Sequence, residues 1–131
     1  MATRSVQRTT AALRELGITY AIVEHWNDHA GVRQDMLGFI DIVALWPQKG
    51  VVAIQACATD YAEHVRKLTG LRRAAVAQWL SVGLCECGAQ LTHVELWGWR
   101  KVVKKRGSKV KVWRPRVQAF TMEDVSDDFL D

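Results

Sequence analysis

Two short apolar segments separated by a turn constrain the fold of this chain more than any other feature. The first covers residues 38–46 and the second residues 51–57, and the turn between them reads Pro47-Gln48-Lys49-Gly50. Apolar runs joined by turn residues predict an antiparallel hairpin of two buried strands. Each run also contains one polar residue among apolar neighbours, Asp41 in the first and Gln55 in the second. A buried carboxylate is costly without a partner, so Asp41 must have one.

A metal ion is one such partner. Strand side chains alternate between faces, so a hairpin brings Asp41 and Gln55 together near its open end. A carboxylate and an amide oxygen are both hard ligands suited to Mg²⁺. The alternative is an Asp41 that caps a turn or pairs with Arg33. The residues alone leave both interpretations open.

The rest of the chain predicts an α/β (α+β) fold with a single mixed β-sheet flanked by helices. Helices are expected at 5–16, 59–68 and 71–82, and further strands at 18–26, 91–103 and 109–121. The strand at 18–26 alternates, with Ile18, Tyr20 and Ile22 on one face and Thr19, Ala21 and Val23 on the other, and one of these faces is expected to be buried. Asp60 and Glu63 have the spacing of a capping box at the start of the second helix.

The charge distribution predicts a polyanionic partner. The chain of 131 residues suits one domain, 1–121, followed by an acidic tail, 122–131. The tail carries five acidic and no basic residues, which leaves a net charge of +9 on the body of the chain. The basic residues assigned to nucleic-acid binding are Arg33, Arg100, Lys101, Lys104, Lys105, Arg106, Lys109, Lys111, Arg114 and Arg116. A solvated basic hairpin is the alternative.

Cellular location follows from two observations. No run of 18 apolar residues occurs, so no membrane span is expected. Three cysteines are an odd number without a pairing framework, which favours a reducing, cytoplasmic setting, including a host cytoplasm if the gene is a phage gene. Cys85 and Cys87 with His93 offer at most three zinc ligands, so we expect two ordinary thiols there.

The six tryptophans divide into two groups. Trp26, Trp46 and Trp79 are expected in the core. Trp97 and Trp99, two residues apart on one strand face, are expected to pack across a hairpin on Trp113. The Lys and Arg side chains around these rings are then expected to contact phosphates.

The order of several short motifs resembles the PD-(D/E)XK nuclease superfamily. A Gly38-Phe39-Ile40-Asp41 strand precedes an apolar strand that ends in Gln55-Ala56-Cys57. The segments 23–27 and 33–35 before it are similar to small phage nucleases and Holliday-junction-resolvase-like members, including the VRR-NUC branch. Residues 79–80, 98–101 and 113–116 fit the same branch. The resemblance covers roughly residues 13–121 and implies a restriction-endonuclease-like core.

The resemblance also implies roles for individual residues. Asp41 matches the family's metal-binding Asp, and Gln55 stands where the family has a Glu or Gln ligand for Mg²⁺ or Mn²⁺. Cys57 stands at the position of the catalytic Lys, and a thiol supplies no fixed positive charge. Lys67, or its neighbour Arg66, is a candidate to replace that Lys. Glu15 and Asp35 are possible accessory acids.

The expected activity is therefore metal-dependent hydrolysis of DNA phosphodiester bonds, with branched or structured DNA as a possible substrate. A homodimer is implied by the resolvase-like relatives, since two-fold symmetry suits a branched substrate. Loss of activity through Gln55 and Cys57 would leave a DNA-binding protein on the same fold. A protein-interaction factor that uses its basic face for an acidic partner is the third alternative.

Overall fold

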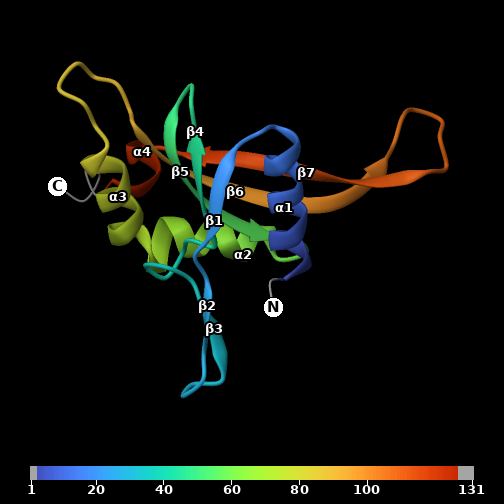
Figure 1. Ribbon diagram of the computed structural model, residues 1–131, viewed down its shortest axis with the longest axis horizontal. Coiled ribbons are helices and arrows are strands. Elements are labelled where there is room, and N and C mark those ends of the chain that lie inside the picture. Colours follow the sequence, from blue (N-terminus) through green and yellow to red (C-terminus); the bar gives the residue numbers. More distant parts are fainter. Residues whose placement is uncertain (1–2, 127–131) are drawn as a thin grey trace.

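The chain folds into one five-stranded mixed sheet with helices on both faces (Figure 1). The structure is a computed structural model that describes residues 3–126. Its helices are α1 (Arg4–Glu15), α2 (Tyr61–Arg66), the π-helical turn η1 (Lys67–Leu71), α3 (Arg73–Val82) and α4 (Met122–Val125). Its strands are β1 (Thr19–Ile22), β2 (His25–Asn27), β3 (Val32–Gln34), β4 (Ile42–Trp46), β5 (Gly50–Cys57), β6 (Thr92–Val103) and β7 (Lys111–Phe120).

The strand order in the large sheet is β1-β4-β5-β6-β7. Neighbouring strands are antiparallel except β5 and β6, which are parallel and joined by the α2–η1–α3 crossover. A parallel pair requires such a long crossover, because a tight turn reverses the chain direction. The predicted class, a mixed sheet flanked by helices, is confirmed.

The central strands separate two hydrophobic cores. Ile42, Val52 and Ile54 face α1, whose Val6 and Leu13 are also buried. On the opposite face, Ala53, Val94 and Leu96 pack with Leu68, Val76 and Leu80 of the crossover. This alternation on β4 and β5 was predicted from the sequence. Because β5 is covered on both faces, its sequence is an almost uninterrupted apolar run.

The covering helices are fixed to the sheet by specific polar and steric contacts. Thr9 of α1 is fully buried and accepts a hydrogen bond of 2.8 Å from the Trp99 indole. The Tyr61 ring of α2 lies against Gly98 of β6, and its hydroxyl donates to Gln118 at 2.7 Å. These contacts position both helices relative to the central strands.

The predicted strand at 18–26 is wrong in its extent. The chain forms β1, leaves the main sheet, and pairs β2 with β3 as a separate two-stranded hairpin that projects from the body (Figure 1). Ile22, the last residue of β1, is 44% exposed. Trp26 lies on the projecting hairpin and is 56% exposed, so its predicted core position is also wrong.

Two predicted local contacts are replaced by others. Asp60 precedes α2 without a side-chain capping bond in the described part of the chain, and Glu63 pairs instead with Arg66. The indoles of Trp97 and Trp99 are buried beside α1 with ring centroids 6.4 Å apart. Trp113 is 39% exposed and lies beneath the Arg8 guanidinium, 3.7 Å from it.

The acidic segment that follows β7 begins as α4, which is capped by Thr121 and Asp124. Val125 of this helix is buried in the core cluster on the crossover face, so this part of the segment packs with the domain. Residues 127–131 of the predicted tail lie outside the described residues. Within residues 3–126, no helix combines the length and apolar character needed to cross a bilayer.

Candidate functional site

The site lies at the open end of the β4–β5 hairpin, where the sequence predicted that Asp41 and Gln55 would meet. Asp41 directly precedes β4, and its backbone N–H donates to the Ile54 carbonyl at 2.9 Å. The side chains of Asp41 and Gln55 are buried, at 4% and 2% exposure. The Gln55 Nε2 donates to Asp41 Oδ2 at 3.2 Å, which confirms the predicted proximity.

A tight turn brings a second carboxylate to the same place. Met36 pairs with Ile40 in an isolated bridge, and Leu37 and Gly38 between them have φ values of 55° and 80°. This left-handed backbone suits glycine and is unusual for leucine. The reversal places Asp35 beside Asp41, so the accessory acid expected at Asp35 lies within the site.

Glu24 is the third member of a group of acids at this site, and the sequence did not predict its presence there. Carboxylate oxygens of Glu24, Asp35 and Asp41 all lie within 4.8 Å of one another; we call this group the acidic cluster. Glu24 sits between β1 and β2 and is paired with Arg33 of β3 at 3.3 Å. The position of Glu24 depends on where the chain leaves the main sheet, and no spacing in the sequence marks that point.

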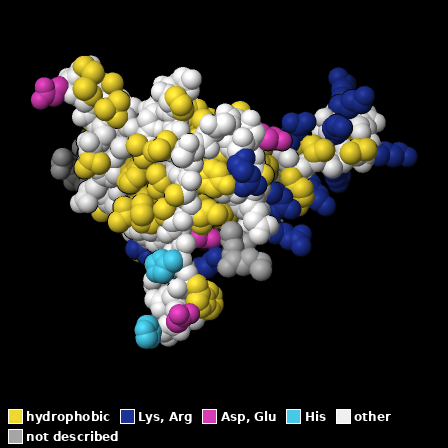
Figure 2. Space-filling view, in the orientation of Figure 1, with side chains coloured by type: hydrophobic (Ala, Val, Ile, Leu, Met, Phe, Trp, Pro, Cys, Tyr) yellow, Lys and Arg dark blue, Asp and Glu magenta, His cyan; other side chains and the backbone are white. Residues whose placement is uncertain are grey.

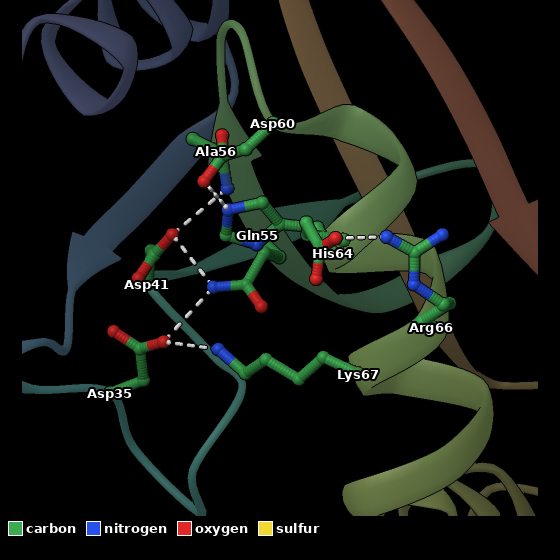
Figure 3. A network of polar contacts seen from close by, with 9 residues as sticks. Asp35, Asp41, Gln55, Ala56, Asp60, His64, Arg66 and Lys67 are labelled. Carbon is green, nitrogen blue, oxygen red and sulfur yellow. Dashed lines mark hydrogen bonds and ion pairs between the residues drawn. The ribbon is translucent and has the colours of Figure 1, made fainter.

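Polar groups from β5 and η1 converge on the cluster (Figure 3). The Gln55 Nε2 also donates to Asp35 Oδ2 at 2.9 Å, and the Ala56 backbone N–H donates to Asp41 Oδ2 at 2.8 Å. The Lys67 ammonium of η1 donates to Asp35 Oδ2 at 3.1 Å. Lys67, predicted as a replacement for a missing lysine, is therefore in the site, whereas Arg66 points to Glu63.

The two aspartates have opposite pKa shifts. Burial and the adjacent Asp35 carboxylate raise the pKa of Asp41 to about 8. Burial also raises the pKa of Asp35, but hydrogen bonds from Asp41 and Gln55 and the Lys67 charge outweigh it, so the net pKa is lowered. The Lys67 charge stabilises the ionised form of Asp35, whereas burial and the adjacent Asp35 charge disfavour ionisation of Asp41. Near neutral pH the pair therefore holds one proton, mainly on Asp41.

The donor set fits a hard divalent cation. Carboxylate oxygens are the ligands that Mg²⁺ and Mn²⁺ prefer, and a cation replaces the proton that the pair otherwise holds. Gln55 Oε1 is buried without a hydrogen-bond partner among the described residues. Rotation of the amide would turn this oxygen toward the carboxylates, an arrangement that is favourable only with a cation between them.

Two other predicted residues lie in different surroundings. Cys57 is buried on β5, two residues beyond Gln55, and lines the same surface hollow as Asp41. Burial and the charges of Asp60 and Asp41 raise the pKa of its thiol to about 11. Glu15 is exposed at the end of α1 and lines a separate hollow with Trp113 and Arg114. The fold therefore does not place Glu15 in the acidic cluster.

The predicted phosphate-binding cations lie on one long projection. The outer part of the β6–β7 hairpin, residues 100–116, extends away from the sheet, and we call it the basic arm (Figure 1). Its Lys and Arg side chains are exposed and gather at and near its tip (Figure 2). Arg33 is the exception among these cations, because it is half-buried beside Glu24 at the acidic cluster.

No protein-family model, curated protein or solved structure matches this chain.

Proposed function

We propose that this protein is a metal-dependent endonuclease-like hydrolase of DNA phosphodiester bonds, with Mg²⁺ or Mn²⁺ held by Asp41, Asp35 and Glu24. The observation that carries this proposal is the convergence of three carboxylates within 4.8 Å beside the Lys67 ammonium. A divalent cation at such a cluster supplies charge stabilisation to a phosphate and lowers the pKa of a bound water.

The chain's own groups have separate tasks in this reaction. The carboxylates hold the cation, and Ala56 N–H and Gln55 fix the orientation of Asp41. Lys67 supplies a positive charge next to the cluster, where it stabilises negative charge that develops on the phosphate. In the resemblance described above this task belongs to the residue at position 57, and here the thiol of Cys57 cannot perform it.

The basic arm supports DNA as the substrate. Its exposed cations carry no acidic residue among them, and such a surface attracts a polyanion over long distances. Branched DNA is the favoured substrate, since the projecting β2–β3 hairpin beside the cluster offers an exposed Trp26 on which an unpaired base can stack.

The test is a cleavage assay with linear duplex, flap and four-way-junction DNA, each with Mg²⁺, Mn²⁺ or EDTA. We expect cleavage with the metals, none with EDTA, and a rate at least about 100-fold lower for Asp41→Asn, which loses a charged ligand. Failure of the wild-type protein to cut any of these substrates would overturn the proposal.

A non-catalytic DNA-binding protein on the same fold is the second candidate. It is favoured by one observation, namely that Gln55 presents its nitrogen, not its oxygen, to the two carboxylates. If this candidate is right, wild type and Asp41→Asn bind DNA equally well and neither cuts it. Isothermal titration with Mg²⁺ then separates the two candidates, because the catalytic one requires cation binding that Asp41→Asn removes.

A further inference from the structure

A second group of side chains with metal-ligating atoms lies next to the acidic cluster. Ligand atoms of Cys57, Asp60 and His64 all lie within 4.8 Å of one another. Cys57 ends β5, Asp60 directly precedes α2, and His64 is one helical turn further on. The turn from strand to helix therefore creates the group, with a Cys-x₂-Asp-x₃-His spacing in the sequence.

The polar side chains of this group contact each other and leave one ring nitrogen unpaired. Asp60 occupies the cap position of α2 but makes no capping bond within the described residues, and its Oδ2 lies 3.1 Å from His64 Nε2. The other ring nitrogen, His64 Nδ1, is buried and has no hydrogen-bond partner in the described chain. The imidazole is therefore held by the Asp60 carboxylate alone among the side chains that the structure describes, and it has a nitrogen left for a further ligand.

The surrounding hollow supplies a second sign of a ligand. It has a volume of about 380 Å³ and is lined by Cys57, Asp60, His64 and Gln55 among others. Gln55 is 2% exposed, and its Oε1 is the other buried side-chain atom without a partner in residues 3–126. Figure 3 shows this oxygen turned away from the two carboxylates, on the side of α2. The two residues that carry unsatisfied buried atoms, Gln55 and His64, thus line one hollow together with a thiol and a carboxylate.

A thiol nucleophile activated by the histidine is the competing interpretation, and the contacts disfavour it. His64 bonds to Asp60 through one ring nitrogen, and the other has no partner in the described structure, so the imidazole does not accept the Cys57 proton. Cys57 is also only 4% exposed. Its pKa is raised to about 11, opposite to the shift that a reactive cysteine needs.

We propose that Cys57, Asp60 and His64 form a binding site for a zinc-class transition-metal ion. Thiolate, carboxylate and imidazole are the three ligand types of protein zinc sites, and three protein ligands leave one position open toward the hollow. The thiol proton is released to solvent when the ion binds. The neighbouring acidic cluster has oxygen ligands only, so the two sites differ in softness and select different ions.

This proposal does not depend on the nuclease activity, and its test reads out binding alone. The probe is Co²⁺, which occupies zinc sites and gives a near-ultraviolet thiolate-to-cobalt band when a thiolate coordinates it. The full chain carries Cys85→Ser and Cys87→Ser, because those two thiols lie 3.1 Å apart and could bind cobalt themselves. We expect this protein to bind about one equivalent of Co²⁺ with the band, and Zn²⁺ to displace it.

Further substitutions in the same background assign the ligands. Cys57→Ser should abolish the band, and His64→Gln should weaken Co²⁺ binding by about 100-fold or more, while His29→Gln on the exposed β2–β3 turn should not. Asp41→Asn should keep the band although it loses Mg²⁺ binding, which separates this proposal from the proposed function. Absence of the band in the Cys85→Ser/Cys87→Ser protein, or its persistence after Cys57→Ser, would overturn the proposal. Circular dichroism of each variant confirms that it is folded.

Discussion

The Lys67 Nζ lies 3.1 Å from Asp35 Oδ2, so an ammonium of the helical crossover reaches the turn that precedes β4. The two side chains are 27% and 19% exposed, which makes this ion pair stronger than one on an open surface. The positive charge beside Asp35 therefore comes from the Lys67 ammonium of the π-helical turn.

Substitution of Lys67 tests this role. Lys67→Met should lower the rate of DNA cleavage by about 100-fold, because it removes one group that stabilises charge on the phosphate. Mg²⁺ affinity should be unchanged or tighter, since a cation next to Asp35 is lost. Single-turnover cleavage and isothermal titration measure the two quantities. Arg66→Met is the matched control and should behave as wild type; cleavage by Lys67→Met at the wild-type rate would contradict the assignment.

Stability without metal should fall as the pH rises. The pKa of Asp41 is raised from 3.8 to about 8 on folding, so between these values the folded state binds more protons than the unfolded state. The free energy of unfolding then decreases with pH across this window, by an amount on the order of a few kcal/mol. The lowered pKa of Asp35 acts in the opposite direction, but only around and below its ordinary value of 3.8.

Urea denaturation in EDTA at pH 5 and pH 8 measures this effect. Asp41→Asn removes the titrating group, so the variant should lose less stability than wild type between the two values. Asp28→Asn on the β2–β3 turn is the matched control. Mg²⁺ should restore stability at pH 8, because the cation replaces the proton. A wild-type protein that is equally stable at both pH values would show that Asp41 is not protonated in this way.

Binding of DNA should depend on the basic arm. Substitution of Lys104, Lys105 and Arg106 by Ala at the tip should weaken duplex binding and lower the slope of log K against log salt by up to about 3. Arg14→Ala on α1 serves as a control outside the arm. Fluorescence anisotropy across a salt series measures both effects. A flat salt response of the wild-type protein would exclude phosphate contacts as the source of affinity.

Gly98 should be required for the contact between α2 and the sheet. A Cβ added at Gly98 would lie 2.3 Å from Tyr61 Cδ2, so Gly98→Ala forces the ring to move. We expect a loss of about 1–3 kcal/mol in unfolding free energy, measured by urea denaturation. Gly70→Ala, where a Cβ meets no described atom within 4 Å, should cost much less. The double variant Gly98→Ala/Tyr61→Ala should be less destabilised than the sum of the single variants.

The β4–β5 hairpin at the centre of the sheet was predictable because its signals are local. The apolar runs around Ile42 and Ile54, the turn 47–50 and the alternation of side chains fix a hairpin without knowledge of the rest of the chain. The same local register brings Gln55 to Asp41. The helices at the start of the chain and after β5 were likewise marked by Gly17 and Gly83.

The remainder of the site depends on long-range packing. The sequence from Ile18 to Trp26 alternates throughout, yet the chain leaves the sheet after Ile22, and this departure alone places Glu24 in the acidic cluster. The spacing of Asp60 and Glu63 matches a capping box, but Asp60 turns to His64 instead. The local sequence pattern around Asp60 does not predict which of two polar partners its side chain contacts once α2 packs on the sheet.

The parallel pairing of β5 with β6 also has a consequence for the order of folding. Asp41 and Gln55 meet through the local β4–β5 hairpin, whereas Val51 pairs with Thr92 only after the whole crossover has docked. Closing a short loop costs less entropy than closing a long one, so we expect the hairpin to form first. The acids of the acidic cluster would then lie close together for a time without the Lys67 ammonium. Mg²⁺ present during refolding should therefore accelerate the later docking of the crossover. Stopped-flow fluorescence can measure this rate.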